Sequence, residues 1–88
     1  MYYIQSSHVE TSPVGDRVVL YDNVSRKAVV LNPTGAWLWV QLSTRSSPDE
    51  LTDKLQTRFA SVPREQLQAD VEACLRDLSH QNLLHEEA

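Results

Sequence analysis

The chain has 88 residues, of which 41% are hydrophobic and 23% charged, and its net charge at pH 7 is −4. This length and composition predict a single folded domain, residues 1–88, with a modest core. The acidic balance disfavours a nucleic-acid binder, because phosphate contacts need clustered Lys and Arg. One cysteine excludes an internal disulfide and any multi-cysteine metal site. We see neither a membrane span nor a signal peptide, so we expect a cytoplasmic protein.

Two strand-forming runs in the first third of the chain predict an antiparallel hairpin. Arg17–Tyr21 and Lys27–Leu31 are apolar and β-branched, and a turn of about five residues, 22–26, joins them. Before them, the short run His8–Thr11 precedes the turn-forming cluster Ser12–Asp16. The short run predicts a further strand, which would make a sheet of three.

Three helices are expected after the strands. The first runs from about Pro33 to Leu42, with Asn32 as its cap. The second opens at Ser47–Glu50, whose Ser and Glu form a capping-box pattern. The third starts at Pro63, and its apolar residues repeat with a helical period: Leu67, Val71, Cys74, Leu75 and Leu78. Strands followed by helices predict an α+β fold, a small three-stranded antiparallel sheet and then three helices, in an order that a winged helix-turn-helix also shows.

The stretch Leu31-Asn32-Pro33-Thr34-Gly35-Ala36-Trp37-Leu38-Trp39 resembles the corresponding corner of the PqqD-like family, the RiPP recognition elements. Weaker similarity covers roughly residues 9–84 and includes Val18–Asp22, Pro48–Leu51, Asp70-Val71 and the ending Leu83-Leu84. The resemblance implies a non-catalytic domain that binds the leader segment of a ribosomally made precursor peptide. Such a domain delivers the precursor to a separate modifying enzyme or leader peptidase.

Within that family, two kinds of protein are similar to this chain. A standalone domain of this length resembles the leader-binding proteins of lasso-peptide clusters, whose partners are a leader peptidase and a macrolactam-forming cyclase. The alternative is standalone PqqD, a peptide chaperone that serves a radical-SAM enzyme. Neither reading implies a cofactor bound by the chain itself.

The resemblance also implies where the peptide binds, namely as a strand added to the edge of the third strand, beside the third helix. The run Lys27–Leu31 is apolar and lacks proline, so it can offer an unbroken ladder of backbone groups. On the helix, Asp70, Cys74 and Asp77 fall along one flank at about 100° per residue. The predicted peptide-binding residues are Lys27, Ala28, Val29, Val30, Leu31, Asp70, Val71, Cys74, Asp77 and Leu78.

The apolar and the acidic candidates would bind different parts of the peptide. Apolar residues of the strand and helix would line pockets for apolar side chains of the peptide. Asp70 and Asp77 would hold a Lys or Arg of the leader. Which flank of the helix faces the strand does not follow from the sequence. An apolar edge strand can also pair with its own copy, which would give a homodimer.

Two other classes of function are disfavoured. Catalysis by Cys74 with His80 or His85 lacks an orienting acid, and the thiol lies among acidic residues rather than in an electropositive setting. The three histidines also lack metal-ligand spacing. A winged-helix DNA-binding role would require the third helix to enter a groove, but its charged residues sum to −2 over residues 64–78, which phosphates would repel.

Overall fold

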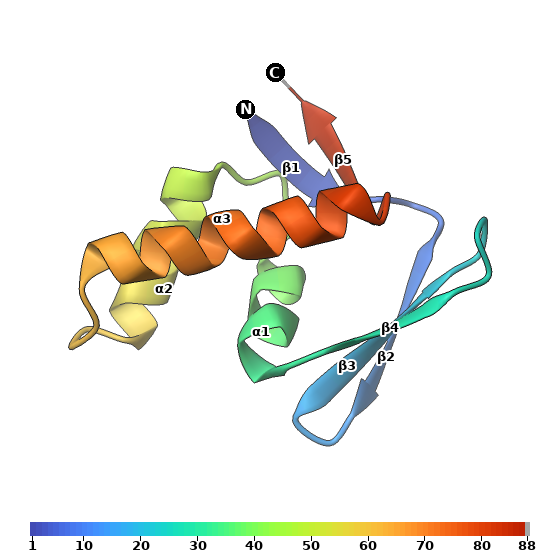
Figure 1. Cartoon of the computed structure of the whole chain (residues 1–88), viewed down its shortest axis with the longest axis horizontal. Coiled ribbons are helices and arrows are strands. Elements are labelled where there is room, and N and C mark those ends of the chain that lie inside the picture. Colours follow the sequence, from blue (N-terminus) through green and yellow to red (C-terminus); the bar gives the residue numbers. More distant parts are fainter. Residues whose placement is uncertain (88) are drawn as a thin grey trace.

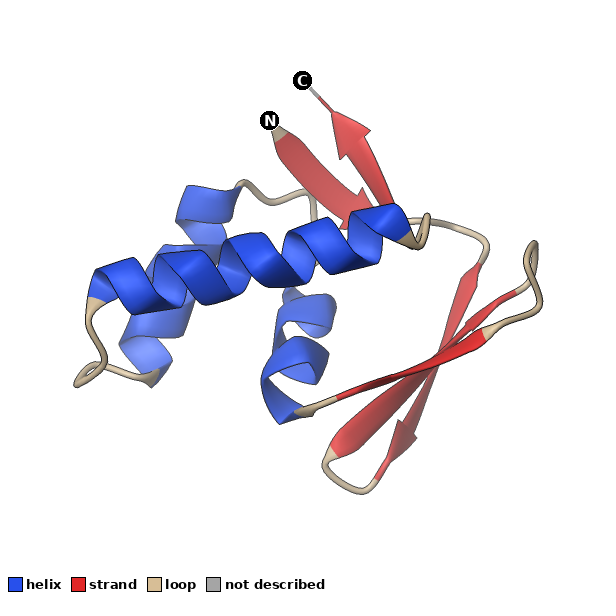
Figure 2. Ribbon diagram, viewed as in Figure 1, coloured by secondary structure: helices blue, strands red, loops and turns tan. Residues whose placement is uncertain are grey.

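The computed structural model describes residues 1–87 and shows the predicted α+β order with one addition, a strand at each end of the chain (Figures 1 and 2). The elements are β1 (Tyr2–Gln5), β2 (Val9–Val14), β3 (Arg17–Asp22), β4 (Ala28–Leu31), α1 (Pro33–Gln41), α2 (Pro48–Arg58), α3 (Arg64–His80) and β5 (Leu84–Glu87). Among these residues, no helix is long and apolar enough to cross a membrane.

The predicted three-stranded sheet is present, in the order β2-β3-β4 with both pairs antiparallel. Its first strand is longer than the sequence indicated, because β2 continues through Pro13. Pro13 lies opposite Val18, whose own backbone groups are directed at β4, so the missing N–H of Pro13 faces away from the sheet. The turn to β3 then needs only two residues, and Gly15 adopts the positive φ of 64° at its first position.

The loop between β3 and β4 fixes where the last strand of this sheet begins. The carboxylate of Asp22 accepts the N–H groups of Val24 (2.8 Å) and Ser25 (3.2 Å), and its backbone N–H donates to the carbonyl of Lys27 (2.9 Å). Asp22 therefore belongs to β3 rather than to the turn, and Lys27 stands just before β4 rather than inside it. Burial raises the pKa of the Asp22 carboxyl, but these hydrogen bonds, the Ser25 hydroxyl and nearby His8 outweigh burial and lower the pKa.

The predicted helix starts are confirmed. Asn32 caps α1 by accepting the N–H of Gly35 at 2.7 Å, with Pro33 in the first turn. Ser47 and Glu50 form the reciprocal capping box of α2. The third helix begins one residue after Pro63, which precedes it without a side-chain cap.

The core joins the sheet to the helices through α1. Trp39 of α1 is fully buried, and its indole N–H donates to the hydroxyl of Thr11 on β2 at 2.9 Å. Leu20 of the central strand is buried with it, as are four of the apolar residues that repeat with a helical period along α3: Leu67, Val71, Leu75 and Leu78. Trp37 lies two residues away on a different face of α1 and is only half-buried, beside the guanidinium of Arg58.

The two ends of the chain form a second sheet that the sequence did not predict. β1 pairs antiparallel with β5, and the apolar Leu83-Leu84 segment leads into β5. On its other side β1 bonds to the loop between α1 and α2, because Tyr3 and Ser46 exchange backbone hydrogen bonds of 2.8 and 2.9 Å. This sheet lies against the C-terminal part of α3, away from β2-β3-β4 (Figure 1).

Candidate functional site

The strand β4 is an edge of the three-stranded sheet, and no other strand among residues 1–87 pairs with its outer side. The hydrogen bond between Asp22 and Lys27 sets which residues face inward, because inward and outward pairs alternate along an antiparallel ladder. Val29 and Leu31 therefore direct their N–H and C=O groups at β3. Ala28 and Val30 direct theirs outward, where a further strand can accept and donate.

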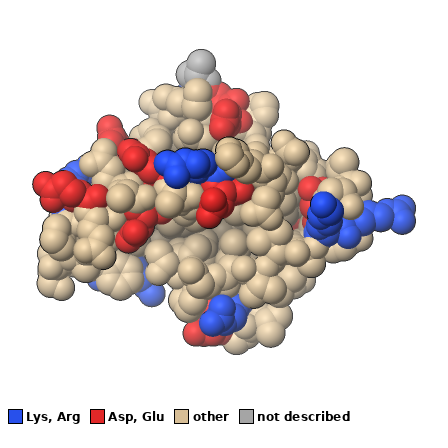
Figure 3. Space-filling view, viewed as in Figure 1, with Lys and Arg blue, Asp and Glu red and all other residues tan. Residues whose placement is uncertain are grey.

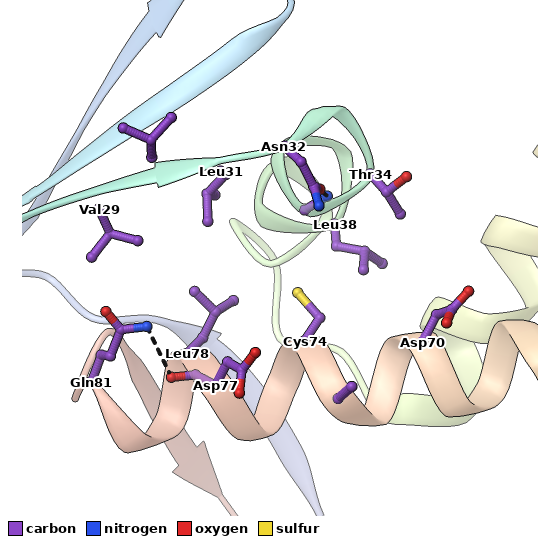
Figure 4. Close-up of a pocket in the computed structure, with 13 residues that line it drawn as sticks. Val29, Leu31, Asn32, Thr34, Leu38, Asp70, Cys74, Asp77, Leu78 and Gln81 are labelled. Carbon is purple, nitrogen blue, oxygen red and sulfur yellow. Dashed lines mark hydrogen bonds between the residues drawn. The ribbon is translucent and has the colours of Figure 1, made fainter.

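A groove of about 530 Å³ runs between this edge and α3 (Figure 4). From the strand, the side chains of Val29 and Leu31 point toward the helix, and Leu31 is buried while Val29 is half-buried. Val30 borders the groove as well, but its side chain belongs to the opposite face of the sheet and is 61% exposed. The strand thus supplies two apolar side chains and a backbone edge.

The opposite wall comes from α3. The lining residues of the helix and its C-cap follow the spacing i, i+3, i+4, i+7, i+8 and i+11, which places them on one face: Asp70, Ala73, Cys74, Asp77, Leu78 and Gln81. Figure 4 shows Cys74 and Leu78 pointing into the space between helix and strand, with Asp70 and Asp77 on the same flank. The structure therefore decides the question left open by the sequence. The flank that carries Asp70, Cys74 and Asp77 is the one that faces β4.

The N-terminal turn of α1 closes one end of the groove, and sequence reasoning missed it. Asn32, Thr34, Gly35 and Leu38 all line this end. Gly35 is constrained, because a Cβ added there would lie 3.2 Å from the Asn32 side-chain oxygen and 3.6 Å from Leu31 Cβ. The signal was present in the Asn-Pro-Thr-Gly sequence, which we interpreted as a helix cap and as part of the family resemblance, but not as part of the binding site. Ala73 of α3 and its C-cap Gln81 were also missed, although the spacing by three and four residues would have included them.

Three of the predicted binding residues lie outside the groove lining. Val71 is fully buried in the core, and so it supports α3 rather than presenting a surface. Ala28 is exposed and offers only its outward backbone groups. Lys27 lines a separate cavity of about 280 Å³, which shares Val29 and Gln81 with the groove. The other seven candidates border the groove itself.

The chemistry of the groove suits binding rather than reaction. Burial, and to a smaller extent Asp77, raise the pKa of the Cys74 thiol to about 11, so the nucleophilic thiolate is scarce at neutral pH. Within residues 1–87, no group of three or more His, Cys, Asp or Glu is placed to hold a metal ion. The arrangement offers an apolar floor, an acidic flank and a strand edge, which are the parts needed to hold an extended peptide.

An open-edged antiparallel sheet beside a helix, with a groove between them, is an arrangement to which an extended peptide can add as a further strand. Comparison with known families is more specific: residues 17–84 match the family described as coenzyme PQQ synthesis protein D (PqqD). The match spans most of the chain, and the chain therefore belongs to the PqqD family, as the resemblance in its sequence indicated. No curated protein matches it significantly.

Two solved structures share the fold over almost their whole length. One is described as TbiB1 in complex with the TbiA(beta) leader peptide; it is 27% identical, the TM-score is 0.86, and the match covers 97% of this chain and 98% of TbiB1. The other is a lasso peptide synthetase B1 complexed with the leader peptide, which is 20% identical with a TM-score of 0.80 over 96% and 98% of the two chains. Both of those proteins hold a leader peptide.

Proposed function

We propose that this chain is a non-catalytic cytoplasmic adaptor that binds the leader segment of a ribosomally synthesised precursor peptide as a fourth strand beside β4. The observation that carries the proposal is the unpaired outer edge of β4, where the N–H and C=O groups of Ala28 and Val30 point outward along a groove. An exposed edge of this kind is a liability for aggregation unless something covers it. A bound peptide strand would supply that cover.

The groove explains how selection would accompany backbone pairing. In an added strand, alternate side chains point to the same face. One set would therefore enter the groove against Val29, Leu31, Cys74 and Leu78, while the other set would join the outer face of the sheet. Backbone hydrogen bonds would give affinity for any extended segment, and the groove would prefer apolar side chains at alternate positions.

We further propose delivery to a lasso-type leader peptidase or modifying enzyme. The support is the similarity to TbiB1, which is 27% identical over nearly the whole of both chains and holds a leader peptide. The family description, coenzyme PQQ synthesis protein D, favours a second candidate, a peptide chaperone for a radical-SAM enzyme. Reconstitution with each kind of enzyme and its precursor would separate the two, because only the correct partner would process the precursor faster when this chain is added.

The test of strand addition is peptide binding by a proline variant. The probe is a synthetic peptide covering the leader half of the small open reading frame beside the gene, and the variant is Val30→Pro. Proline removes an outward N–H and leaves the inward ladder to β3 intact, so circular dichroism should be unchanged. The peptide would lose a donor to one of its carbonyls, which costs about 2 kcal/mol or roughly thirtyfold in Kd.

A matched control separates the backbone from the side chain. Val30→Thr keeps the N–H, the β-branched shape and the exposed position, and it should bind the peptide as well as the wild type does. Equal binding by Val30→Pro and the wild type, or no binding by either protein, would contradict the proposed function.

A further inference from the structure

The groove beside β4 is electrically polarised along its length. Asp70 and Asp77 lie on its helical wall, and Lys27 lies beyond its other end, in the cavity that shares Val29 and Gln81 with it. None of these three charged residues forms an ion pair within residues 1–87. Figure 3 shows basic side chains standing out at the side of the molecule that carries the loop between β3 and β4, whereas acidic ones gather over α3.

The other charges near this path are already engaged or face elsewhere. Asp22 borders the cavity with Lys27, but its carboxylate accepts two backbone N–H groups and lies 3.6 Å from His8. Glu72 and Arg76 border a cavity on the other side of α3, next to β1 and β5. Among the Asp, Glu, Lys and Arg residues that line the groove and the adjoining cavity, those without an ion pair within residues 1–87 are thus Asp70, Asp77 and Lys27.

The dimensions match a short strand. From Asp70 to Gln81, α3 rises about 16 Å, which is the length of roughly five residues of an extended peptide. Asp70 and Asp77 are about 10 Å apart along the helix, within reach of one long basic side chain placed between them. A peptide antiparallel to β4 would run from the Asn32 end toward the Lys27 end, because β4 itself runs from Ala28 to Leu31.

We propose that Asp70, Asp77 and Lys27 are specificity-determining residues that select a leader strand with a Lys or Arg over the acidic flank and an Asp or Glu a few residues later, near Lys27. This inference rests on the proposed function and adds a charge pattern to it. Opposite charges at the two ends also distinguish direction, since a strand entering in reverse would place like charges together at both ends.

The test uses random peptides, so that it does not depend on knowing the leader sequence. A displayed library of random twelve-residue peptides is selected on the immobilised full chain, and the most enriched peptide is synthesised. We expect enriched sequences in which a basic residue precedes an acidic one. Asp77→Lys reverses a charge on the groove wall and should raise the Kd of the synthetic peptide about fivefold. Replacing the basic residue of the peptide by Glu should restore its affinity for that variant.

Glu72→Lys is the matched control, because it makes the same change of net charge on the same helix but away from the groove. It should leave binding unchanged. Enriched peptides that lack the charge pattern, or equal effects of Asp77→Lys and Glu72→Lys, would overturn this inference while leaving strand addition intact. Enrichment of no peptide, or of peptides that bind Val30→Pro equally well, would overturn the proposed function and this inference with it.

Discussion

The two edge strands of the three-stranded sheet, β2 and β4, differ in how they present their outer sides, although both pair with β3. β2 carries Pro13 with its missing N–H on the outer side, and its Thr11 hydroxyl is held by the buried Trp39. β4 has no proline, and the groove lies beside it. Pro13 interrupts the outer backbone edge of β2, and the hydrogen bond between Trp39 and Thr11 ties that strand to the core. The outer edge of β4 keeps its outward N–H and C=O groups.

This difference shows that one edge of a small sheet can stay available for pairing while the opposite edge is protected. The two outermost strands share the partner β3, so pairing on one side does not require openness on the other. Protection of β2 would leave the outer side of β4 as the edge at which pairing with another strand is expected. If both edges were open, copies of the chain could stack edge to edge into longer sheets.

The largest effect that we expect concerns the alkylation rate of Cys74, whose side chain lines the groove beside β4. With a pKa of about 11 rather than 9.0, its thiolate fraction at pH 8 is lower by about a hundredfold, and alkylation by iodoacetamide should be slower by that factor than in the urea-unfolded chain. The rate should climb as the pH is raised toward 11. Bound peptide should lower the rate further. Alkylation of the folded and unfolded chains at equal rates would contradict the position of Cys74 in the groove wall.

The next largest effect tests whether β2 is a structural edge. Thr11→Val leaves the indole N–H of the buried Trp39 without its acceptor, which should lower the free energy of unfolding by about 1–3 kcal/mol. Urea unfolding measures this loss, and Thr11→Ser, which keeps the hydroxyl, is the control. Peptide affinity should stay the same at temperatures where the variant is folded. A variant as stable as the wild type would show that the hydrogen bond does not anchor this edge.

A third effect concerns the turn that sets the start of β4. The folded-state pKa of Asp22 is lowered, so its charge stabilises the fold above the unfolded pKa, near 3.8, and this contribution is lost as the pH falls through the folded value. Asp22→Asn keeps an oxygen for the turn but removes the charge. The stability difference between wild type and variant should be present at pH 7 and shrink below about pH 4. A difference that is constant with pH would show that the charge of Asp22 is not involved.

The smallest effect should come from opening the closed edge. Pro13→Val restores an outward N–H on β2 without touching β4, so leader binding should not change. Sedimentation at high protein concentration should reveal a modest increase in self-association compared with the wild type. If the variant instead gained a second peptide-binding site, proline would be the main feature that separates the two edges.

Much of this arrangement was predictable because its signals are local. The caps at Asn32 and Ser47, the hairpin strands and the buried face of α3 each depend on residues within a few positions of one another. The helical period likewise placed Asp70, Cys74 and Asp77 on one flank, and the alternation of side chains along a strand puts Val29 and Leu31 on one face. The length of β2 was underestimated, because Pro13 is tolerated in an edge strand at a position whose N–H would be unused.

What the sequence determined by itself was the type and order of the elements from the second strand to the third helix, since periodicity and capping act over a few residues. Only the tertiary structure decided that the chain ends pair as β1 and β5, that the N-terminal turn of α1 closes the groove, and that the Asp70–Asp77 flank faces β4. These outcomes depend on contacts between elements far apart in the sequence, such as β1 with β5 and α3 with β5. Such contacts follow no local period, so periodicity and capping do not predict them.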